Sequence, residues 1–105
     1  MTWPNDADGD VLRRLESHSF DFAKKHRVDF NVDFTSWPPS ARAIEILRSR
    51  FEYVEICAPR GSDAGYVLLK VTGLVSYEFV TSIQRSVTSA MKPYNGACES
   101  WGLLD

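Results

Sequence analysis

Residues 27–34 read RVDFNVDF, and this strict alternation of polar and apolar side chains decides the fold. Alternation with a period of two puts Val28, Phe30 and Val32 on one face of a strand and the intervening polar residues on the other. This stretch is the clearest strand in the chain. The remaining elements are predicted outward from it.

The segments on either side of this strand carry helical and extended patterns in turn. Residues 5–18 place acidic side chains before apolar residues at helical spacing, which predicts an N-terminal helix. Residues 39–50 and the segment between Ser76 and Pro93 keep a 3.6-residue apolar period, which predicts two more helices. Residues 53–58 and 66–72 are β-branched and aromatic and flank a turn at residues 59–65, so they predict a hairpin. Residues 97–103 are predicted to form an edge strand.

This order of elements predicts an α+β fold, in which an extra N-terminal helix precedes a β-α-β-β-α-β unit. Right-handed crossovers put both later helices on one face of a four-stranded antiparallel sheet, which is the ferredoxin-like sandwich with strand order 4-1-3-2. A length of 105 residues suits one core, so residues 1–105 are expected to form a single domain. The expected core residues are Val28, Phe30, Val32, Leu47, Val67, Leu69, Phe79, Ile83 and Val87.

Composition argues against two classes of partner. Twelve Lys and Arg stand against fourteen Asp and Glu, so the net charge of -2 lacks the basic excess typical of direct nucleic-acid binding. The sequence has no apolar run of about 18 residues, and its N-terminus is polar and acidic, so we expect no membrane association and a cytoplasmic location. Cys57 and Cys98 are expected to be buried small hydrophobes rather than disulfide partners or zinc ligands.

No motif predicts catalysis, a metal or a cofactor. Residues 6–10, DADGD, resemble the start of a calcium loop, but Val11 and Ser17 stand where Gly and a bidentate Glu are needed. An acidic helix start is the preferred interpretation. His18 and His26 have no spacing that brings a carboxylate or a third ligand to them, so we interpret them as helix-end and loop residues. The chain is therefore expected not to be an enzyme, and no catalytic residue is predicted.

The sheet face opposite the two crossover helices is the most informative surface. Alternation assigns to it Asp29, Asn31, Asp33, Tyr53, Glu55, Cys57, Tyr66, Leu68, Lys70, Glu99 and Trp101. Aromatic side chains among carboxylates repel RNA but suit an Arg- or Lys-rich protein segment. Two alternatives stay open: the N-terminal helix, with Phe20 and Phe22, covers part of this face, or Trp101 only fastens the last strand.

The sequence also resembles a known family. The segments KPYNG at residues 92–96 and CESWG at residues 98–102, together with residues 28–34 and WPP at residues 37–39, resemble the RraB family, regulators of ribonuclease E activity. The resemblance covers nearly the whole chain by its order of elements, and Trp101 and Gly102 are its matching positions. It implies a ferredoxin-like bacterial protein that binds the nuclease and inhibits RNA cleavage, without catalysis or a cofactor. One departure is charge, because the best-known members are more acidic and carry a long acidic C-terminal tail.

The sequence thus predicts a non-enzymatic regulatory domain that binds a protein partner, a ribonuclease of the ribonuclease E type with a basic segment. No direct contact with nucleic acid is expected, and the oligomeric state is left open. The alternative is a ferredoxin-like domain that binds a small ligand. In a dimeric form of this alternative, the ligand lies between the two subunits. The predicted partner-binding residues are Asp29, Asn31, Asp33, Tyr53, Tyr66, Glu99, Trp101 and Gly102.

Overall fold

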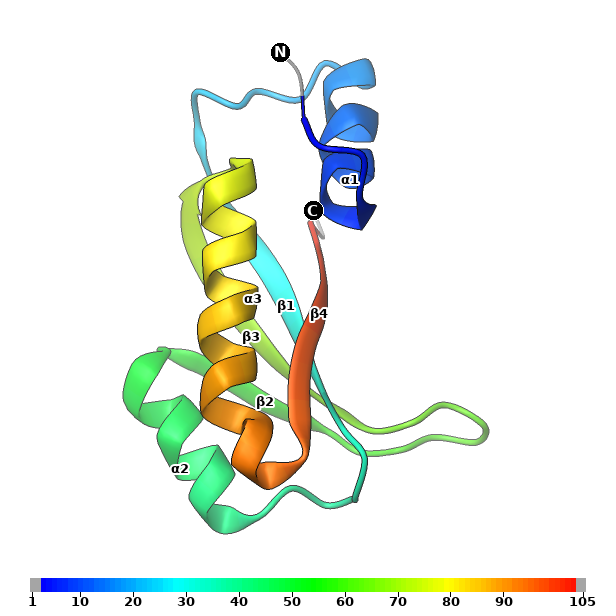
Figure 1. Cartoon of the computed structure of the whole chain (residues 1–105), viewed down its shortest axis with the longest axis vertical. Coiled ribbons are helices and arrows are strands. Elements are labelled where there is room, and N and C mark those ends of the chain that lie inside the picture. The colour runs from blue at the N-terminus through cyan, green and yellow to red at the C-terminus, as the bar shows by residue number, and fades with distance from the viewer. Residues whose placement is uncertain (1–2, 104–105) are drawn as a thin grey trace.

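The computed structural model describes residues 3–103. Its elements are α1 (Ala7–Ser17), β1 (Lys25–Phe34), α2 (Ala41–Arg50), β2 (Tyr53–Cys57), β3 (Tyr66–Leu74), α3 (Tyr77–Met91), the 3-10 helix η1 (Lys92–Tyr94) and β4 (Gly96–Gly102) (Figure 1). The strands form one antiparallel sheet in the order β2-β3-β1-β4. Read from β4, this is the predicted order 4-1-3-2, so the predicted α+β fold is confirmed.

The helices α1, α2 and α3 each begin beside a side chain that accepts a hydrogen bond from the first turn. Asp6 Oδ1 accepts from the backbone N–H of Gly9 at 2.8 Å, and the hydroxyls of Ser40 and Ser76 cap α2 and α3 in the same way. Such caps satisfy backbone donors that have no partner within the helix. The cap at Ser76 is the predicted one, whereas α2 begins two residues later than predicted because Ser40, and not Pro39, precedes its first turn.

The core lies between the sheet and the layer of α2 and α3. The predicted core residues are buried, except that Phe79 and Ile83 are partly buried against its margin. The core extends beyond the expected core residues. Its other buried members include Trp3, Leu12, Val80 and Met91.

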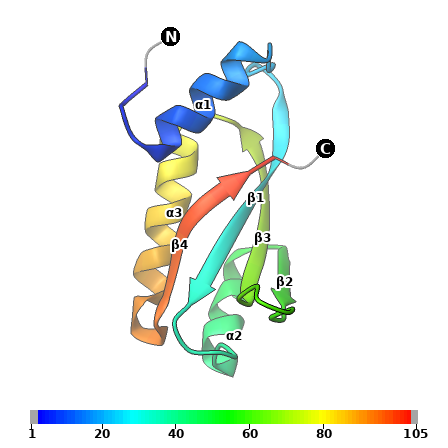
Figure 2. The same cartoon turned by 90° about the vertical axis from the view of Figure 1, so that its right-hand side faces the viewer.

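The first helix packs against α3, not over the free face of the sheet. Figure 2 shows α1 across one end of α3, with no helix on the side of the sheet that faces away from α3. Phe20 and Phe22 follow α1 and pack together, and Phe20 also stacks on His26 with ring centres 4.2 Å apart. His26 precedes Val28 by two residues, so it shares the buried face of β1. The alternative that α1 and these phenylalanines cover the opposite face is therefore wrong.

Candidate functional site

The open face, which we define as the sheet face opposite α2 and α3, is built from rows of paired residues. Residues paired across neighbouring strands point to the same side of the sheet. From β4 through β1 and β3 to β2, the rows are Gly102-Asp29-Lys70-Tyr53, Ser100-Asn31-Leu68-Glu55 and Ala97-Asp33-Tyr66-Cys57. Among the predicted partner-binding residues, the structure thus brings together Asp29, Asn31, Asp33, Tyr53, Tyr66 and Gly102.

Glu99 and Trp101 do not lie on the open face, because β4 contains a β-bulge. Asn31 pairs with Ser100 and Val32 pairs with Cys98, so Glu99 is the extra residue of the bulge. The extra residue shifts the alternation, and Trp101 consequently pairs with Phe30 on the side of the helices. The assignment of Glu99 and Trp101 to the open face is wrong.

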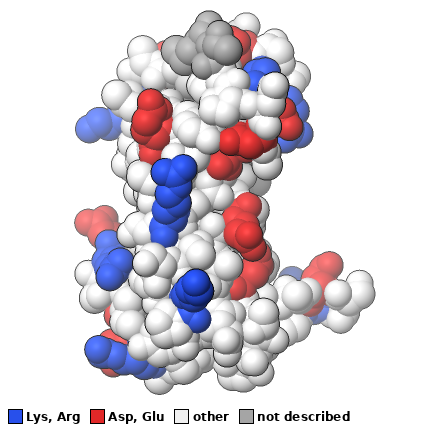
Figure 3. Space-filling view, viewed as in Figure 1, with Lys and Arg blue, Asp and Glu red and all other residues white. Residues whose placement is uncertain are grey.

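Glu99 instead borders an acidic hollow of about 310 Å³ between α1, α3 and β4. In Figure 3, Asp and Glu gather at one end of α1 and along β4, and Lys and Arg lie over α3 and α2 and also on α1. Two carboxylates of this hollow already have internal donors. Asp8 Oδ1 accepts from Trp101 Nε1 at 2.8 Å and from Gln84 Nε2 at 3.1 Å. Trp101 therefore fastens β4 to α1.

Asp6, at the other side of the same hollow, is held in a similar way. The hydroxyl of Tyr77 donates to Asp6 Oδ2 at 2.6 Å, and the backbone of Gly9 donates to Oδ1. The hydrogen bond from Tyr77, and to a smaller extent the one from Gly9, lowers the pKa of Asp6. The bond between Tyr77 and Asp6 also raises the pKa of Tyr77. Residues 6–10, which resemble a calcium loop in sequence, thus use these two carboxylates to position α1.

The acidic residues of the open face differ in exposure. Asp33 and Glu55 are exposed, but Asp29 keeps only 8% of its surface exposed. Lys70 Nζ lies 3.6 Å from Asp29 Oδ1, and Asp29 Oδ2 is buried without a hydrogen-bond partner among the described residues. Asp29 is thus half of a largely buried ion pair. The expectation that residue 29 presents a free carboxylate to a partner is wrong.

The two tyrosines of the open face are half-buried, and each has a neighbour on β2. The hydroxyl of Tyr53 donates to Glu55 Oε1 at 2.5 Å, which raises the pKa of Tyr53. A hydrogen bond with the Cys57 thiol raises the pKa of Tyr66. Arg27 Cζ also lies 5.3 Å from the centre of the Tyr53 ring. Strand alternation assigns Arg27 to this face, but Arg27 was not among the predicted partner-binding residues.

One family of known proteins matches nearly the whole chain. A family model described as "Regulator of ribonuclease activity B" matches residues 5–103. The chain belongs to the RraB family. No curated protein and no solved structure matches it. RraB is a family of regulators, so the predicted family and its regulatory character agree with the match.

The cysteines of this RraB family member lie in different environments. Cys98 is buried on β4, and burial raises the pKa of its thiol to about 12. Cys57 is half-exposed on the open face, so the expectation that both cysteines are buried is wrong for Cys57. Within residues 3–103, no three His, Cys, Asp or Glu side chains lie close enough together to hold a metal ion.

The structure also shows where the two histidines lie and whether a described helix could span a membrane. His18 follows the last turn of α1, as predicted. His26 lies in β1, so its interpretation as a loop residue is wrong, and its Nε2 lies 2.9 Å from the carbonyl oxygen of Asp21. In the described part of the chain, no helix has both the length and the apolar character needed to cross a bilayer. The cytoplasmic location stays a prediction.

Proposed function

We propose that this RraB protein regulates a ribonuclease of the ribonuclease E type by binding it directly, without catalysis of its own. Membership of a family of ribonuclease regulators supports a nuclease as the target. The observation that carries the proposal is the open face, where Tyr53, Tyr66 and Leu68 are half-exposed and no described helix covers them. Half-exposed aromatic side chains on a sheet face that no described helix covers suit a protein interface.

A basic segment of the partner fits best beside Tyr66. Asp33 pairs with Tyr66 across β1 and β3, and Glu55 lies one row away on β2. Both carboxylates are exposed, so they attract and orient a Lys- or Arg-rich segment while Tyr66 supplies buried contact area. The acidic hollow beside α1 is less suited to this role, because Asp6 and Asp8 are engaged in holding α1.

The test measures binding and inhibition with the same proteins. Purified ribonuclease E is immobilised, its association with the full chain is followed by biolayer interferometry, and its cleavage of a fluorescent RNA is followed in parallel. We expect a specific complex and slower cleavage. Tyr66→Ala should mainly speed dissociation, whereas Asp33→Asn with Glu55→Gln should slow association and flatten its salt dependence.

A matched control separates the open face from net charge. Glu45→Gln with Glu78→Gln removes an equal number of negative charges from α2 and α3, on the other side of the sheet, and it should leave binding unchanged. Absence of a complex with the wild-type chain would refute direct binding. Equal binding by the wild type, Tyr66→Ala and the open-face double variant would refute the interface.

A further inference from the structure

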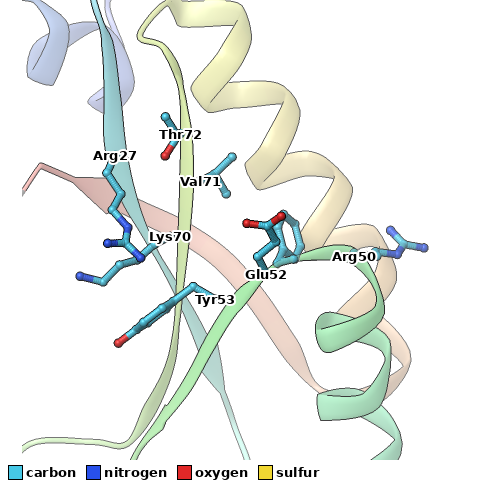
Figure 4. Close-up of a pocket in the computed structure, with 8 residues that line it drawn as sticks. Arg27, Arg50, Glu52, Tyr53, Lys70, Val71 and Thr72 are labelled. Atoms are coloured by element: carbon cyan, nitrogen blue, oxygen red, sulfur yellow. The ribbon is translucent and has the colours of Figure 1, made fainter.

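One corner of the open face gathers positive charge around an aromatic ring. Arg27 Cζ and Lys70 Nζ each lie 5.3 Å from the centre of the Tyr53 ring. Figure 4 shows Arg27 and Lys70 reaching from β1 and β3 toward Tyr53 on β2, beside a hollow of about 630 Å³ that Arg50 and Thr72 also line. We call Arg27, Tyr53 and Lys70 the cationic corner.

The two cations of this corner differ in their partners. Lys70 is paired with Asp29, which offsets its charge. Arg27 has no carboxylate partner anywhere in residues 3–103, and its one described interaction is with the Tyr53 ring. A guanidinium group is a planar fork of five N–H donors that matches a carboxylate. The corner therefore offers a fork that no group of the described chain uses.

The guanidinium beside the ring, unpaired within the described residues, favours a bound anion. Arg27 supplies most of the attraction, because the charge of Lys70 is already offset by Asp29. A carboxylate would also accept charge-assisted hydrogen bonds, which are about twice as strong as neutral ones. Thr72 pairs with Arg27 across β1 and β3, so its hydroxyl is a further donor on the same face.

We propose that the cationic corner binds the carboxylate of an Asp or Glu side chain in an acidic peptide segment of a protein partner. The surroundings favour a short acidic peptide over RNA. Exposed Glu52 lines the same hollow, Glu55 and Asp33 lie farther along the open face, and the chain has a net charge of -2. A continuous phosphate chain would leave the corner and meet these carboxylates, whereas a single acidic side chain would not.

This inference rests on the proposed function for the identity of the protein that carries the acidic residue. It also predicts the orientation in which a segment of that protein binds along β1. Arg27 and Asp33 lie on the same face of β1, about 20 Å apart at the usual rise of a strand. A bound segment then meets positive charge at one end of the open face and negative charge at the other. Its acidic residue lies near Arg27 and its basic residues near Asp33, which fixes its orientation along β1.

The test uses the full chain and a fluorescein-labelled peptide of sequence Glu-Gly-Ser-Gly-Ser-Lys-Lys, which we call the single-glutamate peptide. Binding is measured by fluorescence anisotropy at low ionic strength. We expect saturable binding by the wild type. Arg27→Gln should weaken this binding about tenfold, the effect of losing a hydrogen bond to a charged group. Arg27→Lys keeps the charge but loses the fork, so it should weaken binding by a smaller factor. Arg14→Gln removes an equal charge from α1 and should leave binding unchanged.

Two outcomes would overturn the assignment to a carboxylate at this corner. One is a wild-type chain that does not bind the single-glutamate peptide. The other is equal binding by the wild type, Arg27→Gln and Arg27→Lys, with folding of each variant checked by circular dichroism. Hexauridylate RNA is the second probe, and tighter binding of this RNA than of the peptide would assign the corner to nucleic acid and refute the proposal.

The ribonuclease assay distinguishes failure of this inference from failure of the proposed function. A chain that binds and inhibits the nuclease but does not bind the single-glutamate peptide refutes the cationic corner alone. A chain that binds this peptide through Arg27 but does not bind the nuclease refutes the proposed function, and the acidic segment then belongs to another protein partner.

Discussion

The indole N–H of Trp101 donates a 2.8 Å hydrogen bond to Asp8 and so joins the last strand of the sheet to the first helix of the chain. The same oxygen of Asp8 accepts from Gln84 on α3. One carboxylate therefore holds α1 to two elements that are distant in sequence. Trp101, predicted as a partner anchor, has an intramolecular role that can be measured.

Trp101→Phe should lower the free energy of unfolding by about 1–2 kcal/mol, because it removes a hydrogen bond to a charged acceptor and keeps an aromatic ring. Urea unfolding measures the loss, and faster hydrogen exchange in α1 locates it. Glu99→Gln, at the neighbouring bulge, should change stability by less than about 0.5 kcal/mol. Loss of ribonuclease binding by folded Trp101→Phe, with α1 unaffected, would contradict this role.

Phe30→Ala should lower the free energy of unfolding by about 3–5 kcal/mol, since its fully buried ring leaves a cavity among the neighbouring apolar side chains. Thermal and urea unfolding both measure this effect. Ile56→Ala is the control, because the side chain is 45% exposed and its removal should cost less than about 1 kcal/mol. Similar costs at the two positions would show that Phe30 is not a central core residue.

Lys70→Met should destabilise the chain by about 3 kcal/mol, because it leaves the buried carboxylate of Asp29 without a compensating charge. Asp29→Asn in the same chain should recover most of this loss, since no buried charge then remains. A double-mutant cycle from urea unfolding gives the coupling energy between the two residues. A coupling near zero would mean that the ion pair has no effect on stability.

Asp6 should make stability depend on pH in the acidic range. Its pKa in the folded chain lies below the ordinary 3.8, chiefly because of the bond from Tyr77. As the pH falls, the Asp6 carboxylate is therefore protonated in the unfolded chain before it is protonated in the folded chain. The contribution of Asp6 to the free energy of unfolding is present above about pH 4, and it is lost as the pH falls through the pKa of the folded chain. The free energies of unfolding of the wild type and of Asp6→Asn are measured from pH 7 to pH 2. The difference between them should disappear below pH 3.8. A constant difference would contradict this linkage.

Local patterns were sufficient to predict the elements of the sheet and most of its core. The alternation in residues 27–34 correctly placed Val28, Phe30 and Val32 inward, because β1 is a central strand that packs one face on helices. The cap at Ser76 was predicted because its hydroxyl acts on the backbone only three residues away. These features depend on residues that are close in sequence, so local sequence patterns are enough to predict them.

Features that depend on distant residues were not predictable in the same way. Strand alternation assumes one-to-one pairing, so it could not show that Glu99 is extra and that Trp101 turns toward α1. The burial of Asp29 depends on neighbouring strands, including Lys70 on β3, and no local pattern marks it. The position of α1 depends on bonds from Asp6 and Asp8 to partners far along the chain.

The bulge at Glu99 also determines where this fold tolerates a change in chain length. A one-residue deletion in β1 or β3 would turn every following side chain of that strand to the opposite face and expose core residues. The same deletion at the bulge would leave Cys98 opposite Val32 and Trp101 opposite Phe30, with regular pairing between them. The last strand is therefore the one strand among these three in which evolution could remove a residue without rebuilding the sheet.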